Sequence, residues 1–395
     1  MVFGLLQGVK MIKRNVSNFL KNLTTWFPVV AITGPRQSGK TTLAKSLFSN
    51  FTYVNLEDTN ILKQVKTDPM AFVRQHPTQL IIDEAQLAPE LFSAIQVISD
   101  EVGTPGQYIL SGSQNFLLAK RIKQSLAGRC AYVDLHTLTF SELAALGSNM
   151  SVWDFALTGG YPRIYDAEIP CSVYFNAYIK TYIERDVKGY LDVRNLASYE
   201  KMLAICASQA GNLLNTTSIS KAVGVSVKTV NSWLSMLEAS YIVFRLQPYF
   251  ANVKKRLTKT PKLYFYDTGL LCHLLGIKSV NNLKLSEYKG AVLENLVVAE
   301  TIKKHVNNGE SANVYFYRDD SKIEIDLLDF TDANNKKAFE IKATGLYQEK
   351  YAKHLLSTAK TLGVKHENQS VLLDTEYNFN AKNITVGSIE KYLLE

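Results

Sequence analysis

Between residues 27 and 138, short apolar runs alternate with longer stretches in which apolar residues recur every three or four positions. The short runs are typical of buried strands, and the longer stretches are typical of amphipathic helices. Strands that alternate with helices indicate a parallel sheet with helices on both faces. We expect strands beginning near residues 29, 51, 79, 108 and 130. This part of the chain therefore predicts an α/β fold.

From residue 139 onward the apolar positions recur mainly at helical spacing. A helix from about residue 199 is followed by a short helix that ends at Gly224 and by a third helix with Ser226 as its expected N-cap. A short helix, a glycine turn and a capped longer helix are typical of a helix-turn-helix. Two apolar strands, 241–246 and 262–266, would form a wing beside it.

Residues 11–26 also place apolar side chains at helical spacing, next to basic residues. Such a helix lies in a membrane interface or docks on the α/β core, and we expect docking. No stretch reaches the roughly 18 apolar residues of a membrane span, and the apolar residues 1–6 are too few for a signal-peptide core. We therefore expect a cytoplasmic protein with no membrane partner.

Composition agrees with this organisation. At 395 residues the chain exceeds one compact core, which predicts roughly two to four domains. Hydrophobic residues make up 46% and charged residues 20%, as in ordinary globular proteins. The four cysteines show no C-x-x-C spacing, which argues against zinc and disulfides and fits a reducing compartment.

Residues 34–41 match the pattern G-x-x-x-x-G-K-[ST] directly after the first apolar run. Gly34 and Gly39 let the backbone approach phosphate oxygens, Lys40 brings a charge to the β- and γ-phosphates, and Thr41 offers a hydroxyl to Mg²⁺. An ordinary glycine turn is the alternative, but it does not require all four matches. We therefore expect ATP and Mg²⁺ to bind here. The residues assigned to ATP are Gly34, Pro35, Arg36, Gln37, Ser38, Gly39, Lys40, Thr41 and Thr42.

Two later strands end in polar residues that complete this site. Asp83 and Glu84 follow the apolar run at residues 79–82. Asp83 would hold Mg²⁺ together with Thr41, and Glu84 would orient or deprotonate the attacking water. After the strand at 108–111, Ser113 is the first choice to contact the γ-phosphate or the water, with Ser111 and Gln114 as alternatives. A plain turn leaving a buried strand would have the same composition.

Five segments together resemble a large prokaryotic family of AAA-type ATPases. They are residues 12–37, 83–86, 110–113, 126–129 and 159–162. The resemblance implies an ATPase joined to a winged helix and to a C-terminal domain similar to the PD-(D/E)XK nucleases. It implies a core at 1–138, a helical lid at 139–192, a winged helix-turn-helix at 193–268 and a nuclease-like α/β domain at 269–395. Where the family often has Val, this loop has Ser38.

Arg129 is the candidate for a cation that stabilises the transition state. It follows a basic stretch at residues 118–124 and could reach the γ-phosphate of its own subunit or of a neighbour. An arginine that caps a helix C-terminus would look the same in the sequence. Arg121 is the weaker substitute, and a homo-oligomer stays open.

A basic segment between the two wing strands indicates contact with double-stranded DNA. It contains no acid, and the formal net charge of the chain is +8. Such modules also serve only to pack against protein, and the expected recognition helix carries a single lysine. The residues assigned to DNA are Ser226, Lys228, Thr229, Asn231, Lys254, Lys255 and Arg256.

The C-terminal region carries a second set of charged residues. Glu340 and Lys342 share one face of an expected strand, because side chains in a strand repeat every two residues. Asp326 lies on a neighbouring strand and Glu294 on a preceding helix. The carboxylates could hold Mg²⁺ while Lys342 positions a water, although three charges on an edge strand would look similar. We expect the nuclease-like fold and leave cleavage open.

The sequence thus predicts an ATP-hydrolysing AAA-type ATPase that couples its nucleotide state to a winged helix and a nuclease-like domain on DNA. An ATP-gated nuclease and a non-enzymatic scaffold switched by ATP are the alternatives. Glu84 favours hydrolysis over the scaffold, and the set around Asp326 keeps the nuclease open.

Overall fold

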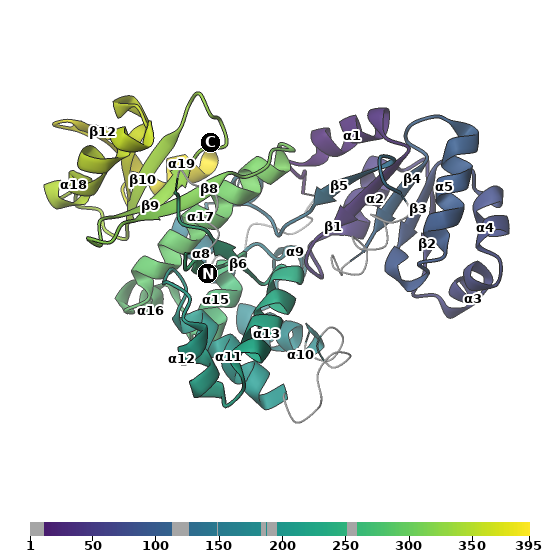
Figure 1. Ribbon diagram of the computed structural model, residues 1–395, viewed down its shortest axis with the longest axis horizontal. Helices are drawn as coiled ribbons and strands as arrows, with labels where there is room; N and C mark the ends of the chain where they lie inside the picture. The colour runs from purple at the N-terminus through teal and green to yellow at the C-terminus, as the bar shows by residue number, and fades with distance from the viewer. Residues whose placement is uncertain (1–11, 113–125, 148, 183–186, 188–195, 251–258) are drawn as a thin grey trace.

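The computed structural model describes residues 12–112, 126–147, 149–182, 187, 196–250 and 259–395. Figure 1 shows a five-stranded sheet from the N-terminal part at one end and a six-stranded sheet from the C-terminal part at the other. Helices from the middle of the chain lie between and below them, with a two-stranded sheet. Among the described residues, no helix is both long and apolar enough to cross a membrane.

The five-stranded sheet is parallel throughout, with strand order β2-β3-β4-β1-β5. Its strands are β1 (Val29–Thr33), β2 (Thr52–Asn55), β3 (Leu80–Asp83), β4 (Tyr108–Ser111) and β5 (Cys130–Asp134). The α/β fold with a parallel sheet is therefore confirmed. Because β4 lies between β1 and β3, the polar residues that end these strands meet at one edge of the sheet.

Helices cover both faces of this sheet, because side chains alternate along each strand. Val30 and Ile32 face α1 (Ser17–Trp26) and α2 (Lys40–Leu47). The opposite face packs against α3 (Thr59–Thr67), α4 (Pro69–Gln75) and α5 (Leu91–Val102), while η2 (Ala85–Leu87) follows β3. Leu20 and Leu23 of α1 are buried in the first cluster, so the expected docking of this helix is confirmed.

The middle of the chain is helical, and the bounds of its helices follow the sequence signals. Ser226 accepts a hydrogen bond from the Thr229 amide at 3.1 Å, and Gly224 ends the preceding helix with a φ of +74°. The helices are α7 (Phe140–Ala144), α8 (Val152–Thr158), α9 (Pro162–Asp166), α10 (Cys171–Tyr182), α11 (Leu196–Ser208), α12 (Thr216–Val223) and α13 (Val227–Ala239). Strands β6 (Val243–Leu246) and β7 (Lys262–Phe265) then pair antiparallel.

The C-terminal region forms the six-stranded mixed sheet, with order β12-β13-β11-β10-β9-β8. Strands β8, β9 and β10 are antiparallel, β10, β11 and β13 are parallel, and β12 is antiparallel to β13. The strands are β8 (Val314–Arg318), β9 (Glu324–Asp329), β10 (Lys337–Lys342), β11 (Gln369–Leu373), β12 (Phe379–Ala381) and β13 (Ile384–Ser388). The helices are α15 (Thr268–Leu274), α16 (Val280–Leu285), α17 (Lys289–Asn307), α18 (Glu349–Thr358), η5 (Ala359–Leu362), η6 (His366–Asn368) and α19 (Ile389–Leu394).

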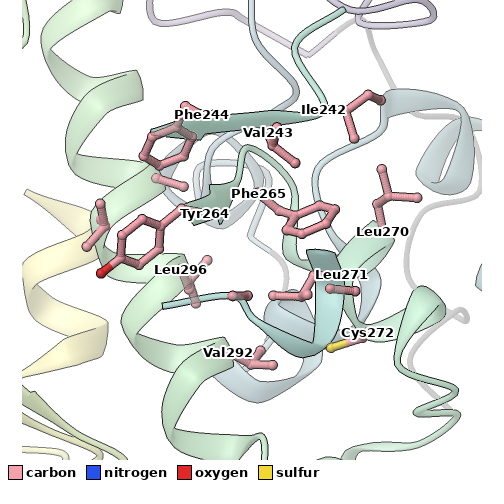
Figure 2. Close-up of a cluster of buried hydrophobic side chains, with 14 of the residues drawn as sticks. Ile242, Val243, Phe244, Tyr264, Phe265, Leu270, Leu271, Cys272, Val292 and Leu296 are labelled. Atoms are coloured by element: carbon pink, nitrogen blue, oxygen red, sulfur yellow. The ribbon is translucent and has the colours of Figure 1, made fainter. Parts of the chain in front are cut away.

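One hydrophobic cluster joins the middle helices to the C-terminal region and extends from Leu138 to Leu393. Figure 2 shows side chains of β6 and β7, such as Phe244 and Phe265, packed with residues of α15 and α17, such as Leu296. All four residues of β7 are buried. The two expected wing strands therefore belong to this core, which includes Leu263 and Leu270 on either side of the expected boundary at residue 269.

Candidate nucleotide-binding site

The loop between β1 and α2 has the backbone that a phosphate cradle requires. Gly34 has a φ of +147°, and a Cβ there would lie 2.2 Å from the carbonyl oxygen of Leu135. Gly39 has a φ of +93° at the N-cap of α2. Both positions therefore need glycine. The first amides of α2 have no acceptor within the helix, so they can bind an anion at the loop.

Lys40 is buried at the start of α2, and its ammonium group lies over the loop. Its Nζ donates to the carbonyl oxygens of Gly34 at 3.0 Å and Pro35 at 2.8 Å. A phosphate oxygen carries a full charge and would be a stronger acceptor than these carbonyls. The side chain is thus held where incoming phosphates can bind it.

Asp83, at the end of β3, accepts four hydrogen bonds. Its Oδ2 accepts from the hydroxyls of Thr41 at 2.7 Å and Tyr53 at 2.9 Å. Its Oδ1 accepts from the Ser111 hydroxyl and from the Glu84 amide at 3.1 Å. The Thr41 and Asp83 oxygens are hard ligands beside the loop. Mg²⁺ prefers such oxygen ligands, and phosphates and waters complete its coordination shell. The residues present therefore fit Mg²⁺.

Glu84 has a left-handed backbone with a φ of +53°, which is unusual for a residue with a side chain. Such conformations persist where the surrounding structure holds them, often at functional sites. The Gln86 amide donates to the Glu84 carboxylate. The structure thus places a second carboxylate directly after Asp83, where a water-activating base is expected.

Tyr53 and Ser111 complete the site, and the sequence analysis did not assign Tyr53 to it. Burial and the nearby Asp83 carboxylate raise the pKa of the Tyr53 hydroxyl, so it remains a neutral donor. The sequence offered Ser111 only as an alternative to Ser113, and Ser113 and Gln114 lie outside the described residues. Only the strand order could have identified Tyr53 as a site residue, because β2 lies directly beside β3.

Arg129 lies at the amino-terminal end of the parallel strands, whereas the phosphate loop lies at their carboxyl-terminal end. Its carbonyl accepts from the amide of Val29, the first residue of β1, whereas the loop follows Thr33 at the other end of that strand. Its guanidinium binds Asp100 at 2.6 and 2.8 Å. Contact with the nucleotide of its own chain does not fit this geometry. A role in a neighbouring subunit stays a prediction, and Arg121 lies outside the described residues.

The charged residues predicted in the C-terminal region come together between α17, β9 and β10. Lys342 Nζ binds Asp326 at 3.0 Å and Glu340 at 2.7 Å. Glu294 of α17 accepts from Lys262 at 2.9 Å and from the Tyr264 hydroxyl at 2.6 Å.

Lysine ammonium groups therefore lie among these carboxylates, where the sequence predicted Mg²⁺. Burial, then Asp326, raises the pKa of the Glu340 carboxyl to about 8. Within the described part of the chain, no group of three or more His, Cys, Asp and Glu side chains is arranged to hold a metal ion. The predicted cluster forms, but with lysines as its cations.

Four residues assigned to DNA lie at the start of α13: Ser226, Lys228 and Asn231 are exposed, and Thr229 is half-buried. The other three, Lys254, Lys255 and Arg256, lie outside the described residues. The start of the helix therefore presents short polar side chains, one lysine and the apolar Val227 to solvent.

Comparison with known proteins divides the chain into three matched segments. Residues 27–144 match the model of an AAA domain. Residues 149–281 and 289–392 match two domains of unknown function, DUF8612 and DUF4143.

Relatives occur in bacteria and archaea. Uncharacterized proteins of Mycobacterium tuberculosis and Mycobacterium bovis are each 30% identical over 337 residues, covering 84% of this chain and 74% of the relative. One of Methanocaldococcus jannaschii is 23% identical over 404 residues, covering 93% and 86%.

Two solved structures are more distant likenesses. The Walker-type ATPase of Pyrococcus abyssi is 14% identical with a TM-score of 0.48, covering 70% of this chain and all of that one. The RuvB Holliday junction branch migration motor of Thermotoga maritima is 17% identical with a TM-score of 0.29, covering 58% and 88%.

Proposed function

The chain belongs to the same protein family as its mycobacterial relatives and carries an AAA domain, and from this premise we propose that it binds and hydrolyses ATP with Mg²⁺. One observation carries the proposal. The Thr41 hydroxyl and the Asp83 carboxylate meet at 2.7 Å beside the buried Lys40, at the mouth of a glycine loop. This arrangement supplies a phosphate cradle, a cation and a pair of oxygen ligands in one place.

The residues then act in distinct ways. The loop amides and Lys40 bind and orient the phosphates. Thr41 and Asp83 would hold Mg²⁺, which when bound neutralises charge on the phosphates. Glu84 orients the attacking water and accepts its proton at the carboxylate. We assign Ser113 to the γ-phosphate, and Arg129 to the γ-phosphate of a neighbouring subunit.

Two variants test this assignment. Lys40→Ala should abolish nucleotide binding because it removes the charge that holds the phosphates. Glu84→Gln should keep wild-type affinity and slow hydrolysis by about 100-fold or more, since it removes only the base. Titration with a fluorescent ATP analogue and a phosphate-release assay measure both. Wild-type affinity in Lys40→Ala would overturn the proposal.

We further propose that nucleotide state is coupled to a winged helix at 193–268 and a nuclease-like domain at 269–395, through the lid at 139–192 that follows the core at 1–138. The Gly224 turn and the capped helix α13 support the helix-turn-helix. The placement of Asp326, Glu340 and Lys342 on adjacent strands supports the nuclease-like fold. The lysines among these carboxylates favour a coupling ATPase over an ATP-gated nuclease.

We propose double-stranded DNA as the partner of α13, because its first turns expose Lys228 and Asn231 without an exposed acid beside them. Each phosphate contact contributes about 0.9 to the slope of log affinity against log salt. Lys228→Ala should therefore lower that slope by about 0.9. Duplex titrations at several salt concentrations measure it, with exposed Lys304→Ala as the control. An unchanged slope would leave α13 as a packing element.

A further inference from the structure

Arg14 lies buried behind the phosphate loop and contacts three separate segments. Its Nη1 donates to the carbonyl oxygen of Ser38 at 2.9 Å, and its Nη2 donates to that of His136 at 2.7 Å. Its Nε is 3.2 Å from both carboxylate oxygens of Glu142 on α7. Only 6% of this arginine is exposed. Every nitrogen of the guanidinium thus has an acceptor, as a buried arginine requires.

The contact with Ser38 controls the last peptide of the loop. In a trans peptide the carbonyl and the following amide point in opposite directions, and the described residues contain no cis peptide. When Arg14 holds the Ser38 carbonyl, the Gly39 amide must point away from Arg14, toward the cradle. An ideal Cβ on Gly39 would lie 3.8 Å from Arg14 Nη1, so the guanidinium packs directly behind this glycine.

An external clamp is needed because glycine does not fix its own conformation. Glycine adopts left- and right-handed backbones with nearly equal ease, so the sequence of the loop alone leaves the Ser38–Gly39 peptide free to rotate. The Ser38 hydroxyl is buried without a hydrogen-bond partner in the described structure, and it adds no anchor. The Ser38 amide donates to the Pro35 carbonyl at 3.3 Å, and the Arg14 contact holds the carbonyl of the same residue.

Glu142 keeps Arg14 in position. Its carboxylate also accepts from the amides of Asn15 at 2.6 Å and Thr139 at 3.0 Å, and its side chain is completely buried. A buried ion pair contributes little to stability because desolvation of the two charges offsets their attraction. Its fixed geometry therefore points to orientation of the loop as its role.

We propose that Arg14 is a positioning residue for nucleotide binding, which orients the Gly39 amide toward the α- and β-phosphates of the bound nucleotide. The inference rests on the proposed ATP binding at this loop. A hydrogen bond to a charged group contributes enough that its loss weakens binding by about 10- to 100-fold.

The test compares Arg14→Met, Arg14→Lys and wild type by titration with ATP. We expect the Kd to rise about 10- to 100-fold in Arg14→Met and to an intermediate value in Arg14→Lys, whose single ammonium cannot hold all three partners. Arg74→Met is the matched control, because it removes an arginine that pairs with Glu101 on the surface of the same domain. Its Kd should equal that of wild type.

The same titration separates positioning from a merely structural role. Loss of folded protein lowers the bound fraction at saturation, whereas loss of orientation raises the Kd of the protein that is folded. Wild-type Kd in Arg14→Met overturns the inference, and if that variant does not fold, wild-type Kd in Arg14→Lys does so. Absence of ATP binding by wild type itself would instead overturn the proposed function.

Discussion

His136 follows β5 and contacts aromatic residues from the middle of the chain. Its ring stacks on Tyr266 with 4.7 Å between centroids and meets Tyr241 edge-on at 5.6 Å. Its Nδ1 is buried and has no hydrogen-bond partner among the described residues. Burial, with Lys303 and Arg14 acting in the same direction and Asp134 opposing them, lowers the pKa of His136 to about 4. A neutral ring therefore fills this junction at neutral pH.

This buried histidine predicts a loss of stability in mild acid. The pKa is near 6.5 in the unfolded chain and about 4 in the folded one, so the unfolded state binds more protons between these values. The histidine's contribution is complete above pH 6.5 and is lost as the pH falls toward 4. Between pH 7 and 5, wild type should lose up to about 2 kcal/mol more stability than His136→Phe, which keeps the ring but cannot titrate.

Urea unfolding of both proteins at pH 7 and pH 5 measures this difference. Because the other titrating groups are present in both proteins, their contributions cancel when the two losses of stability are subtracted. His366→Phe is the control, since that histidine is exposed and should leave the pH dependence as in wild type. Equal loss of stability in wild type and His136→Phe would show that the ring does not carry the effect.

Helix α17 shows which elements the sequence could and could not predict. Its early part binds β7, where the Asn295 side chain bonds both the amide and the carbonyl of Phe265 at 2.8 and 2.7 Å. Its later part binds the segment after β5 through Glu300, whose carboxylate accepts from the Phe140 amide at 2.8 Å. These partners lie 30 and 160 residues away in the chain.

Local patterns therefore predicted the strands of the AAA domain and the N-cap of α13, and they singled out Lys40, Asp83 and Glu84, because each signal lies within a few residues. The same patterns predicted the strands β6 and β7, which pair, and assigned them to a wing. No residue near position 262 indicates that α17 packs against these strands. Tyr53 and Arg14 were missed for the same reason. Their roles arise from strand order and long-range contacts, which a local pattern does not contain.

Lys262 on β7 is the cation that joins this strand to the C-terminal carboxylates. It binds Glu294 at 2.9 Å and Glu324 at 2.6 Å, and its side chain is 4% exposed. Removal of one partner leaves buried charge without compensation, so Lys262→Ala should destabilise the protein by about 3–5 kcal/mol. If the carboxylates then accept a divalent cation, Mn²⁺ should raise the melting temperature of Lys262→Ala but not that of wild type.

Thermal unfolding with and without Mn²⁺ measures both effects. Lys259→Ala is the matched control, because this exposed lysine lies 3.7 Å from fully exposed Asp320 and should change stability by no more than about 0.5 kcal/mol. An equal response of Lys262→Ala and wild type to Mn²⁺ would mean that the cluster is not a metal site even when a lysine is removed.

At the scale of the whole molecule, the carboxyl-terminal and amino-terminal ends of the parallel strands have different neighbours. The carboxyl-terminal end, which carries the phosphate loop, contacts residues from the middle of the chain. The Tyr241 hydroxyl lies 3.1 Å from that of Thr33 and 2.5 Å from Asp134. Tyr241 follows Ser240, the C-cap of α13, with a left-handed φ of +57°. These contacts connect the ends of β1 and β5 to the residue that follows the C-cap of α13. Arg129 lies at the amino-terminal end of these strands.

This separation predicts that Arg129 acts only across a subunit interface. Arg129→Ala keeps the phosphate cradle and Lys40→Ala keeps the arginine, so each variant alone should be inactive in ATP hydrolysis. In an equal mixture, about a quarter of head-to-tail interfaces would combine an intact cradle with an intact arginine, and activity should recover to about that fraction of wild type. A mixture of Arg129→Ala with the Lys40→Ala/Arg129→Ala double variant supplies no arginine and should stay inactive. Phosphate release measured across mixing ratios decides the matter: if every mixture remains inactive while wild type hydrolyses ATP, Arg129 serves only its ion pair with Asp100.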